Sequence, residues 1–168
     1  QVTGVDLTAG VPVTIDASAQ GHAAPSIKVQ VQVAAPVLSL VGVDSSRSVG
    51  QARDDFYVLV SKPAGGTGSQ VAAADMPINT AVVDATPAGL IDGIYSAATG
   101  GVVVTQVVIP VGSSNSTVGS GWTYIGTPSA AGTYRVSASA TGMATVTSPV
   151  VTVSAPALQF NRTTDVVG

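Results

Sequence analysis

An imperfect internal repeat is the feature that most constrains this chain. The segment Tyr134–Phe160 is a copy of the segment Val13–Leu40, with one constant offset in its first half and an offset shorter by one residue in its second half. Matched positions include Val136 with Ile15, Gly142 with Gly21 and Pro156 with Pro36. A self-match at a fixed, domain-sized period marks a tandem array. The sequence therefore predicts a string of similar domains.

The repeat also sets the expected domain boundaries. Each copy ends in a short seam, Ala34–Pro36 or Ala155–Pro156, and proline stiffens such linkers. We expect residues 1–36 to be the closing hairpin of a preceding repeat, 37–156 a complete domain, and 157–168 the first strand of a following repeat. The partial domains would be completed by the same polypeptide, which the matching seams favour, or by strands from a neighbouring subunit.

The composition favours strands over helices. Charged residues make up 9% of the chain, against about a quarter in ordinary soluble domains. Glu is absent and Lys, Leu and Arg are sparse, so strong helix formers are few. Abundant Val and Thr instead fit a pleated, half-buried backbone. The predicted fold class is all-β.

Period-two alternation of apolar and polar residues locates the expected strands. It predicts a hairpin within 13–33, and then strands at 37–43, 54–62, 102–109 and 122–125, with short strands near 70–74 and 80–84 in the less regular segment 69–100. The strand at 54–62 should present Phe56, Val58 and Val60 to one face, and the strand at 102–109 should be largely buried. A closing hairpin of 134–140 and 146–155 should turn one set of side chains inward: Tyr134, Val136, Ala138, Val151 and Val153. About seven short strands with frequent turn signals describe a β-sandwich.

Several short motifs resemble a known family. Gly132–Val136 is similar to the Tyr-x-Cys start of strand F in immunoglobulin folds, with Val136 at the cysteine position. The seam Val153–Pro156, the run Val108–Ser113 before a Ser/Thr-rich stretch, and Ala131–Tyr134 before the closing hairpin resemble bacterial immunoglobulin-like (Big-type) repeats. The resemblance implies an immunoglobulin-like β-sandwich and a role as a spacer or adhesive module in surface proteins, fibres and phage appendages.

Acidic residues offer one candidate metal site. Asp54 and Asp55 are adjacent, so they should point to opposite faces of a strand and cannot form a catalytic carboxylate pair. With Asp44 nearby at a domain seam, they are candidate ligands for a structural calcium ion, which prefers several hard oxygens. In so diffuse a pattern, however, the aspartates more often bind no ion.

Other motifs point to surface roles rather than catalysis. His22 is the only histidine and is expected in a solvated turn, because the repeat places Met143 at the matching position. Residues 65–68 lack the Lys-Ser/Thr of a phosphate-binding loop and are interpreted as a turn. Asn115 and Asn161 each begin an N-glycosylation tripeptide, whose use depends on the host.

The aromatic residues are few: four Tyr, two Phe and one Trp. Tyr134, behind Gly132, is expected to form a corner hydrogen bond to the upstream loop. A sugar-binding platform of exposed rings would need several rings on one face, and we expect Trp122, Tyr124 and Tyr134 to serve the core instead.

These observations exclude several classes of function and favour one. The net charge of −3 and the scattered cations provide no basic stripe for nucleic acid, and no cysteine is present for disulfides or thiolate chemistry. No apolar run is long enough to span a bilayer as a helix.

We expect a non-enzymatic structural module of an extracellular or cell-surface fibre, stalk or adhesin-type protein, with neighbouring copies of the repeat as partners and no cofactor besides the candidate calcium. The alternatives are an adhesive module that binds a glycan or host protein through the loops of 63–100, and a fragment of a secreted enzyme.

Overall fold

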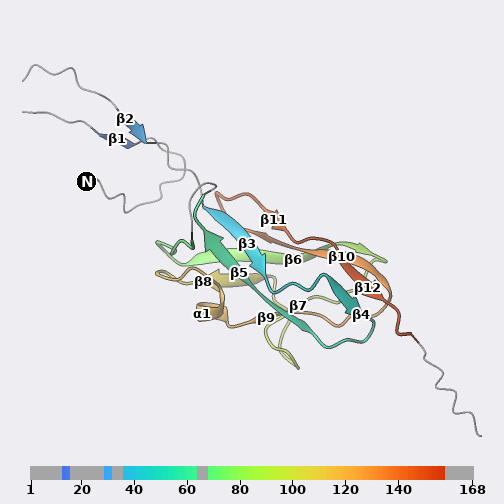
Figure 1. The fold of residues 1–168 in the computed structure, drawn as a ribbon. Coiled ribbons are helices and arrows are strands. Elements are labelled where there is room, and N and C mark those ends of the chain that lie inside the picture. The colour runs from blue at the N-terminus through green and yellow to red at the C-terminus, as the bar shows by residue number, and fades with distance from the viewer. Residues whose placement is uncertain (1–12, 16–28, 32–35, 64–67, 158–168) are drawn as a thin grey trace, which may run out of the picture.

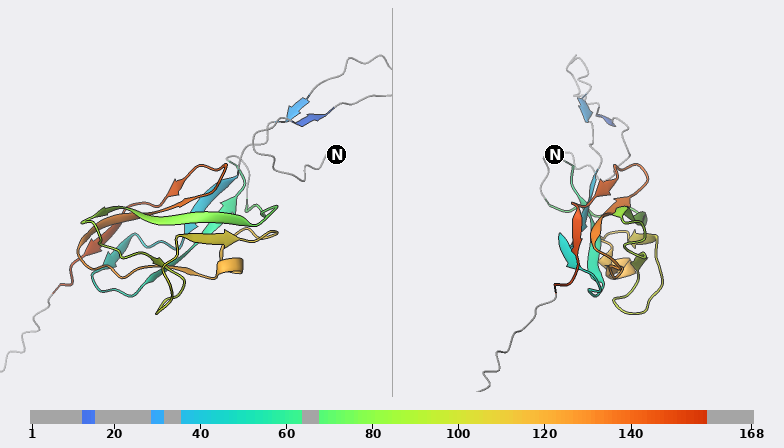
Figure 2. Two further views of the ribbon diagram at one scale, coloured as in Figure 1. Left: turned by 180° about the vertical axis from the view of Figure 1, so that it is seen from behind. Right: turned by 90° about the vertical axis from the view of Figure 1, so that its right-hand side faces the viewer.

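A computed structural model describes residues 13–15, 29–31, 36–63 and 68–157. Within these residues the regular structure consists of strands, apart from the short helix α1 (Thr117–Ser120). Two sheets pack face to face: β3 and β5 lie in front of β6 in Figure 1 and behind it in the reversed view of Figure 2. The predicted all-β sandwich is confirmed.

The first sheet has four strands in the order β3-β5-β9-β7. Their bounds are β3 Val37–Val41, β5 Asp54–Ser61, β7 Ile94–Tyr95 and β9 Thr123–Ile125. All three pairings are antiparallel, and the register places Asp55 of β5 and Tyr95 of β7 on either side of Tyr124 of β9. Residues at matched positions share one face of the sheet, so this register decides which side chains lie together outside.

The second sheet has the order β4-β12-β10-β6-β8, with β11 paired to β10. Its strands are β4 Ser46–Ser48, β6 Met76–Thr86, β8 Gln106–Ile109, β10 Gly132–Ser139, β11 Val146–Thr147 and β12 Val151–Ser154. The predicted closing hairpin is present, because β10 pairs antiparallel with both β11 and β12. Its inward set is the expected one: Tyr134, Val136, Ala138, Val151 and Val153 are all buried.

Strand order follows the immunoglobulin arrangement. In chain order β3, β5, β6, β7, β9, β10 and β12 correspond to strands A to G, and the two sheets then read A-B-E-D and G-F-C. The strand β10, which begins at Gly132, therefore occupies the position of strand F, and Val136 lies buried within it. The additional strands β4, β8 and β11 extend this arrangement.

The first and last strands of the sandwich run in the same direction. The strand β4 continues the course of β3 and pairs in parallel with β12, matching Ser46 with Thr152 and Ser48 with Ser154. The chain therefore enters the sandwich at one end, before Val37, and leaves it at the opposite end, after Ser154 (Figure 1).

The core lies between the two sheets. Phe56, Val58 and Val60 of β5 are buried, as predicted, and they face Ile78 of β6 and Ile109 of β8 within one apolar cluster. Alternation explains the pattern, because every second residue of β5 points to the partner sheet. Burying each of these side chains contributes about 1.5–3 kcal/mol.

Two strand predictions were wrong. The apolar run 102–109 is not one buried strand, because Val102 and Val103 are 67% and 57% exposed and β8 begins only at Gln106. The chain changes sheets at this point: Val104 donates its N–H to Ile94 of the first sheet, whereas the carbonyl of Thr105 accepts from Thr80 of the second. In segment 69–100, the strand expected near 80–84 is present as part of the longer β6, whereas the strand expected near 70–74 is not, because this stretch contributes only an isolated bridge at Ala72.

The first two strands are described separately. The strands β1 (Val13–Ile15) and β2 (Val29–Val31) pair antiparallel, with Val13 opposite Val31. Their assignment to a preceding repeat, like the boundaries 37–156 and 157–168, stays a prediction.

Candidate binding surface

A buried arginine joins the two sheets at one end of the sandwich. Arg47 of β4 is 3% exposed, and its Nη1 donates to the carbonyl of Gly126 at 2.9 Å, just after β9. Its Nη2 donates to the carbonyl of Ala52 at 2.5 Å, just before β5. Among the described residues, its Nε finds no acceptor. A charge so deeply buried needs such partners, and these carbonyls make Arg47 a structural link between the sheets.

Tyr134 takes part in this network, which corrects the predicted corner bond. Its hydroxyl accepts a hydrogen bond from Nη1 of Arg47 at 3.3 Å, so the partner is a side chain of β4 rather than an upstream loop. Burial raises the pKa of Tyr134, and the nearby guanidinium opposes the shift. The ring itself is fully buried, so the expected core role of Tyr134 is correct.

The candidate calcium ligands are only partly brought together. Asp54 is largely buried and accepts a hydrogen bond from the backbone N–H of Asp44 at 3.1 Å, whereas Asp55 lies exposed on the opposite face. Burial raises the pKa of Asp54 above its ordinary value. Among the described residues no group of three or more His, Cys, Asp or Glu side chains could hold a metal ion. The calcium site stays a prediction.

Several predicted sites lie wholly or partly outside the described residues. His22, Asn161 and the loop residues 65–67 belong to this group. Asn115 is described: its Oδ1 accepts hydrogen bonds from the backbone N–H and the hydroxyl of Thr117, at 3.0 and 2.6 Å. The side-chain oxygen of Asn115 is therefore engaged by the threonine of its own tripeptide.

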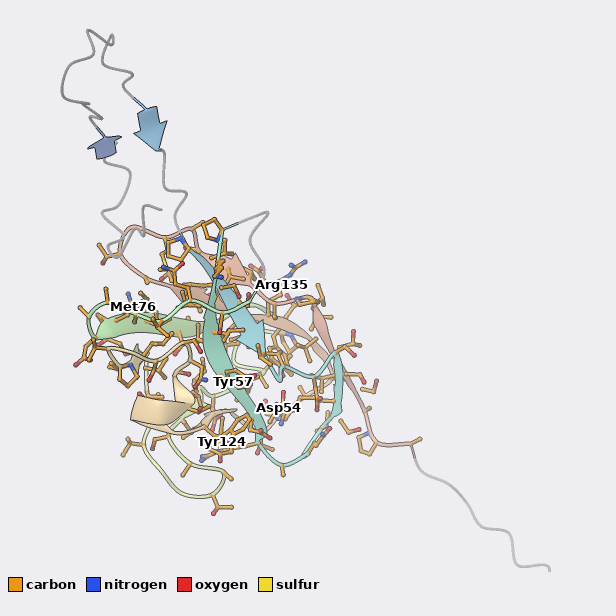
Figure 3. All side chains as sticks on the ribbon, turned by 60° about the vertical axis from the view of Figure 1, so that its left-hand side comes forward. Asp54, Tyr57, Met76, Tyr124 and Arg135 are labelled. Atoms are coloured by element: carbon orange, nitrogen blue, oxygen red, sulfur yellow. The ribbon has the colours of Figure 1, made fainter. Side chains whose placement is uncertain are left out.

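The outer face of the first sheet carries most of the aromatic side chains, which corrects the prediction that Trp122 and Tyr124 serve the core. Trp122 is 44% exposed, and Tyr124 is half-buried between the inward-facing Thr123 and Ile125. Tyr57 of β5 meets Trp122 edge to face, with ring centroids 5.3 Å apart and planes at 85°. We call the surface formed by Asp55, Tyr57, Tyr95, Trp122 and Tyr124 the aromatic face; Figure 3 labels Tyr57 and Tyr124 on it.

One side of the aromatic face is held by internal contacts. The guanidinium of Arg53 lies 3.4 Å from the ring centre of Tyr95, and its Nη1 donates to the carbonyls of Ala97 and Gly100. The hydroxyl of Tyr95 donates to Oδ2 of Asp92 at 2.6 Å, and this bond raises the pKa of Tyr95. These contacts fix Tyr95 and the loop that follows β7.

The remaining polar groups of the aromatic face are unengaged. Within the described parts of the chain, no hydrogen-bond partner is found for the hydroxyls of Tyr57 and Tyr124, the indole N–H of Trp122 or the carboxylate of Asp55. Rings flanked by free donors and acceptors suit a ligand with both apolar and polar surfaces. The sequence did contain a signal for this face, because Trp122 and Tyr124 alternate with Thr123 and Ile125.

Comparisons with known proteins add little to this geometry. No family model and no curated protein match the sequence. Among solved structures, a glycosyl hydrolase family 2 member from Bacteroides cellulosilyticus matches with a TM-score of 0.45 and 12% identity, over 83% of this chain and 17% of that one. A second family 2 structure from this species matches with a TM-score of 0.44 and 11% identity, over 82% and 18% of the two chains. This chain therefore spans less than a fifth of either protein, and likeness at this level assigns it no activity.

Within the described residues, no helix is long and apolar enough to cross a membrane.

Proposed function

We propose that residues 37–156 are a structural module of a tandem array, of the bacterial immunoglobulin-like type, in an extracellular fibre, stalk or adhesin-type protein. The parallel pairing of β4 with β12 is the observation that carries this proposal. Because the chain enters and leaves at opposite ends, successive copies joined by short seams extend along one line rather than folding back.

The same pairing suits a load-bearing spacer. Thr152 donates its N–H to the carbonyl of Ser45, and Val49 donates its N–H to the carbonyl of Ser154, each at 3.0 Å. These hydrogen bonds connect the first part of the sandwich to its last strand. Tension along the chain would therefore load them all at the same time, rather than one after another. Arg47 reinforces this region through its bonds to both sheets.

A non-catalytic role fits how three of the buried polar side chains are used. Arg47, Tyr134 and Ser116 are buried, and each is engaged within the fold: Ser116 accepts the backbone N–H of Val58 at 3.1 Å. Groups committed to the scaffold are poor candidates for proton transfer or nucleophilic attack, which need access to a substrate.

The test adds one copy of the module to the chain. A second copy of residues 37–156 is inserted after Pro156, so that Val37 again follows an Ala-Pro seam, and X-ray scattering measures the longest dimension of both proteins. We expect this dimension to grow by about one sandwich length, because the rigid seam prevents back-folding. In a control, Ala155 and Pro156 are replaced by glycine between the copies, which should broaden and shorten the distance distribution. Equal, compact distributions for both seams would contradict the proposal.

A further inference from the structure

We propose that the aromatic face binds a neutral saccharide chain, a role separate from that of the spacer. Trp122, Tyr57 and Tyr124 would contact the sugar rings, and Asp55 would accept hydrogen bonds from their hydroxyl groups. The site lies on the strands β5, β9 and β7, and Tyr95 of β7 is its one residue from the segment 63–100.

The ligand class follows from the chemistry of the face. A sugar ring has C–H patches, which pack on the electron-rich faces of aromatic rings, and hydroxyls around its rim. The aromatic face has both counterparts: an indole at 44% exposure, and the hydroxyls of Tyr57 and Tyr124, which have no hydrogen-bond partner among the described residues. Because Tyr57 and Trp122 are almost perpendicular, they form a corner that can hold a sugar unit on two sides.

The charges of the face favour a neutral saccharide over an acidic one. The cation Arg53 is occupied by the ring of Tyr95 and by the carbonyls of Ala97 and Gly100. Within the described part of the chain, the carboxylate of Asp55, directly across from Tyr124, is the charged group of this face without a hydrogen-bond partner. It accepts hydrogen bonds from hydroxyls but repels uronate or sulfate groups.

The size of the face favours a saccharide over a protein partner. A standard protein interface takes about 20–30 residues from each side, whereas the aromatic face consists of five side chains, several of them already half-buried. A short stretch of polysaccharide needs only two or three ring contacts. The backbone of β5 and β9 is paired on both sides, so a bound chain would use side chains and not strand addition.

The face is held rigidly, which lowers the cost of binding. The residues that alternate with the outward side chains along β5 and β9 point inward: Phe56, Thr123 and Ile125 are buried in the core. Side chains anchored in this way lose little freedom when a ligand arrives. The guanidinium of Arg53, stacked on the ring of Tyr95, likewise restricts the movement of that side chain.

The experiment uses the emission of Trp122, the single tryptophan of the chain. The 168-residue protein is titrated with cellohexaose, xylohexaose and maltohexaose as neutral probes, and with hexagalacturonate as the charged counterpart. We expect a saturable emission change with at least one neutral probe and a weaker response to hexagalacturonate. No saturable change with any neutral probe at millimolar concentration, or a preference for hexagalacturonate, would overturn the proposal.

Variants locate the site by calorimetry with the neutral probe that binds. Trp122→Ala should weaken affinity by about tenfold or more, and Tyr124→Phe and Asp55→Asn, which keep the shape of the fold, should weaken it by roughly threefold each. Ser137→Ala, on the opposite face of the sandwich, is the matched control and should bind like the parent. Unchanged affinity in Tyr124→Phe and Asp55→Asn would overturn the site, and so would self-association that Trp122→Ala abolishes, because a second copy would then cover the face.

Discussion

The two outer faces of the sandwich are built on the same alternation but carry different side chains. On the second sheet the outward residues include no aromatic ring: Ser137 of β10 lies opposite Ala81 of β6, Ser139 lies opposite Asn79, and Arg135 lies opposite Val83. On the first sheet the corresponding positions carry Tyr57, Tyr124 and Tyr95. The inner faces, in contrast, are both apolar and close-packed.

This difference separates what the fold requires from what it permits. Both inner faces must be apolar, because they form one core. Neither outer face needs aromatic rings, and the second sheet folds without them. A cluster of outward-facing rings on one face only, with Trp122 the exposed member, is therefore the part of the molecule that folding does not explain.

The largest expected effect comes from breaking the link that holds the two sheets together. Arg47→Ala removes the donors to Gly126 and Ala52 and should lower the free energy of unfolding by roughly 3 kcal/mol, because buried acceptors lose a charged partner. Chemical denaturation measures the change. The control is Arg135→Ala, on the outer face of the second sheet, where a 3.9 Å ion pair with Asp84 is exposed and should contribute less than about 0.5 kcal/mol. Similar losses in both variants would contradict the role of Arg47.

A smaller effect should distinguish the two outer faces directly. A double-mutant cycle on Tyr57 and Trp122 should give a coupling energy of about 1 kcal/mol, as for other edge-to-face pairs. The matched pair on the second sheet is Asn79 and Gln106, whose exposed amides are 3.1 Å apart; its coupling should be about 0.3 kcal/mol. Equal coupling energies would remove the energetic distinction between the faces.

The smallest effect concerns pH. Burial raises the pKa of Asp54, so the folded chain holds this proton more tightly than the unfolded chain. The stability that Asp54 contributes is therefore lost as pH rises from the ordinary aspartate pKa through the raised folded value. Asp54→Asn, which can still accept the N–H of Asp44, should gain stability relative to the parent over this window. Urea denaturation at a series of pH values measures the gap, Ser137→Asn should follow the parent, and a gap independent of pH would refute the assignment.

Where apolar and polar residues alternate clearly along the chain, this alternation was sufficient to predict which side chains of a strand are buried. The inward sets of β5 and of the closing hairpin follow from period two, because a strand has only two faces and the core selects the apolar one. The same reasoning failed for 102–109 because this apolar run serves two sheets in turn. The polar residues Thr105 and Gln106 interrupt the run where the chain crosses from one sheet to the other. Because both halves are otherwise apolar, the alternation of residues could not show that these two mark a change of sheet.

By itself, the sequence determined the all-β class, the sandwich and the buried set that includes Tyr134 and Val136. These properties depend on composition and on neighbours along the chain. Only the tertiary structure decided that Tyr57, Tyr95 and Trp122 meet on one surface, and that Arg47 joins β4 to the ends of β5 and β9. Those contacts depend on strand order and register, which bring together residues far apart in the chain, and register is set by the packing of the whole core rather than by any one strand.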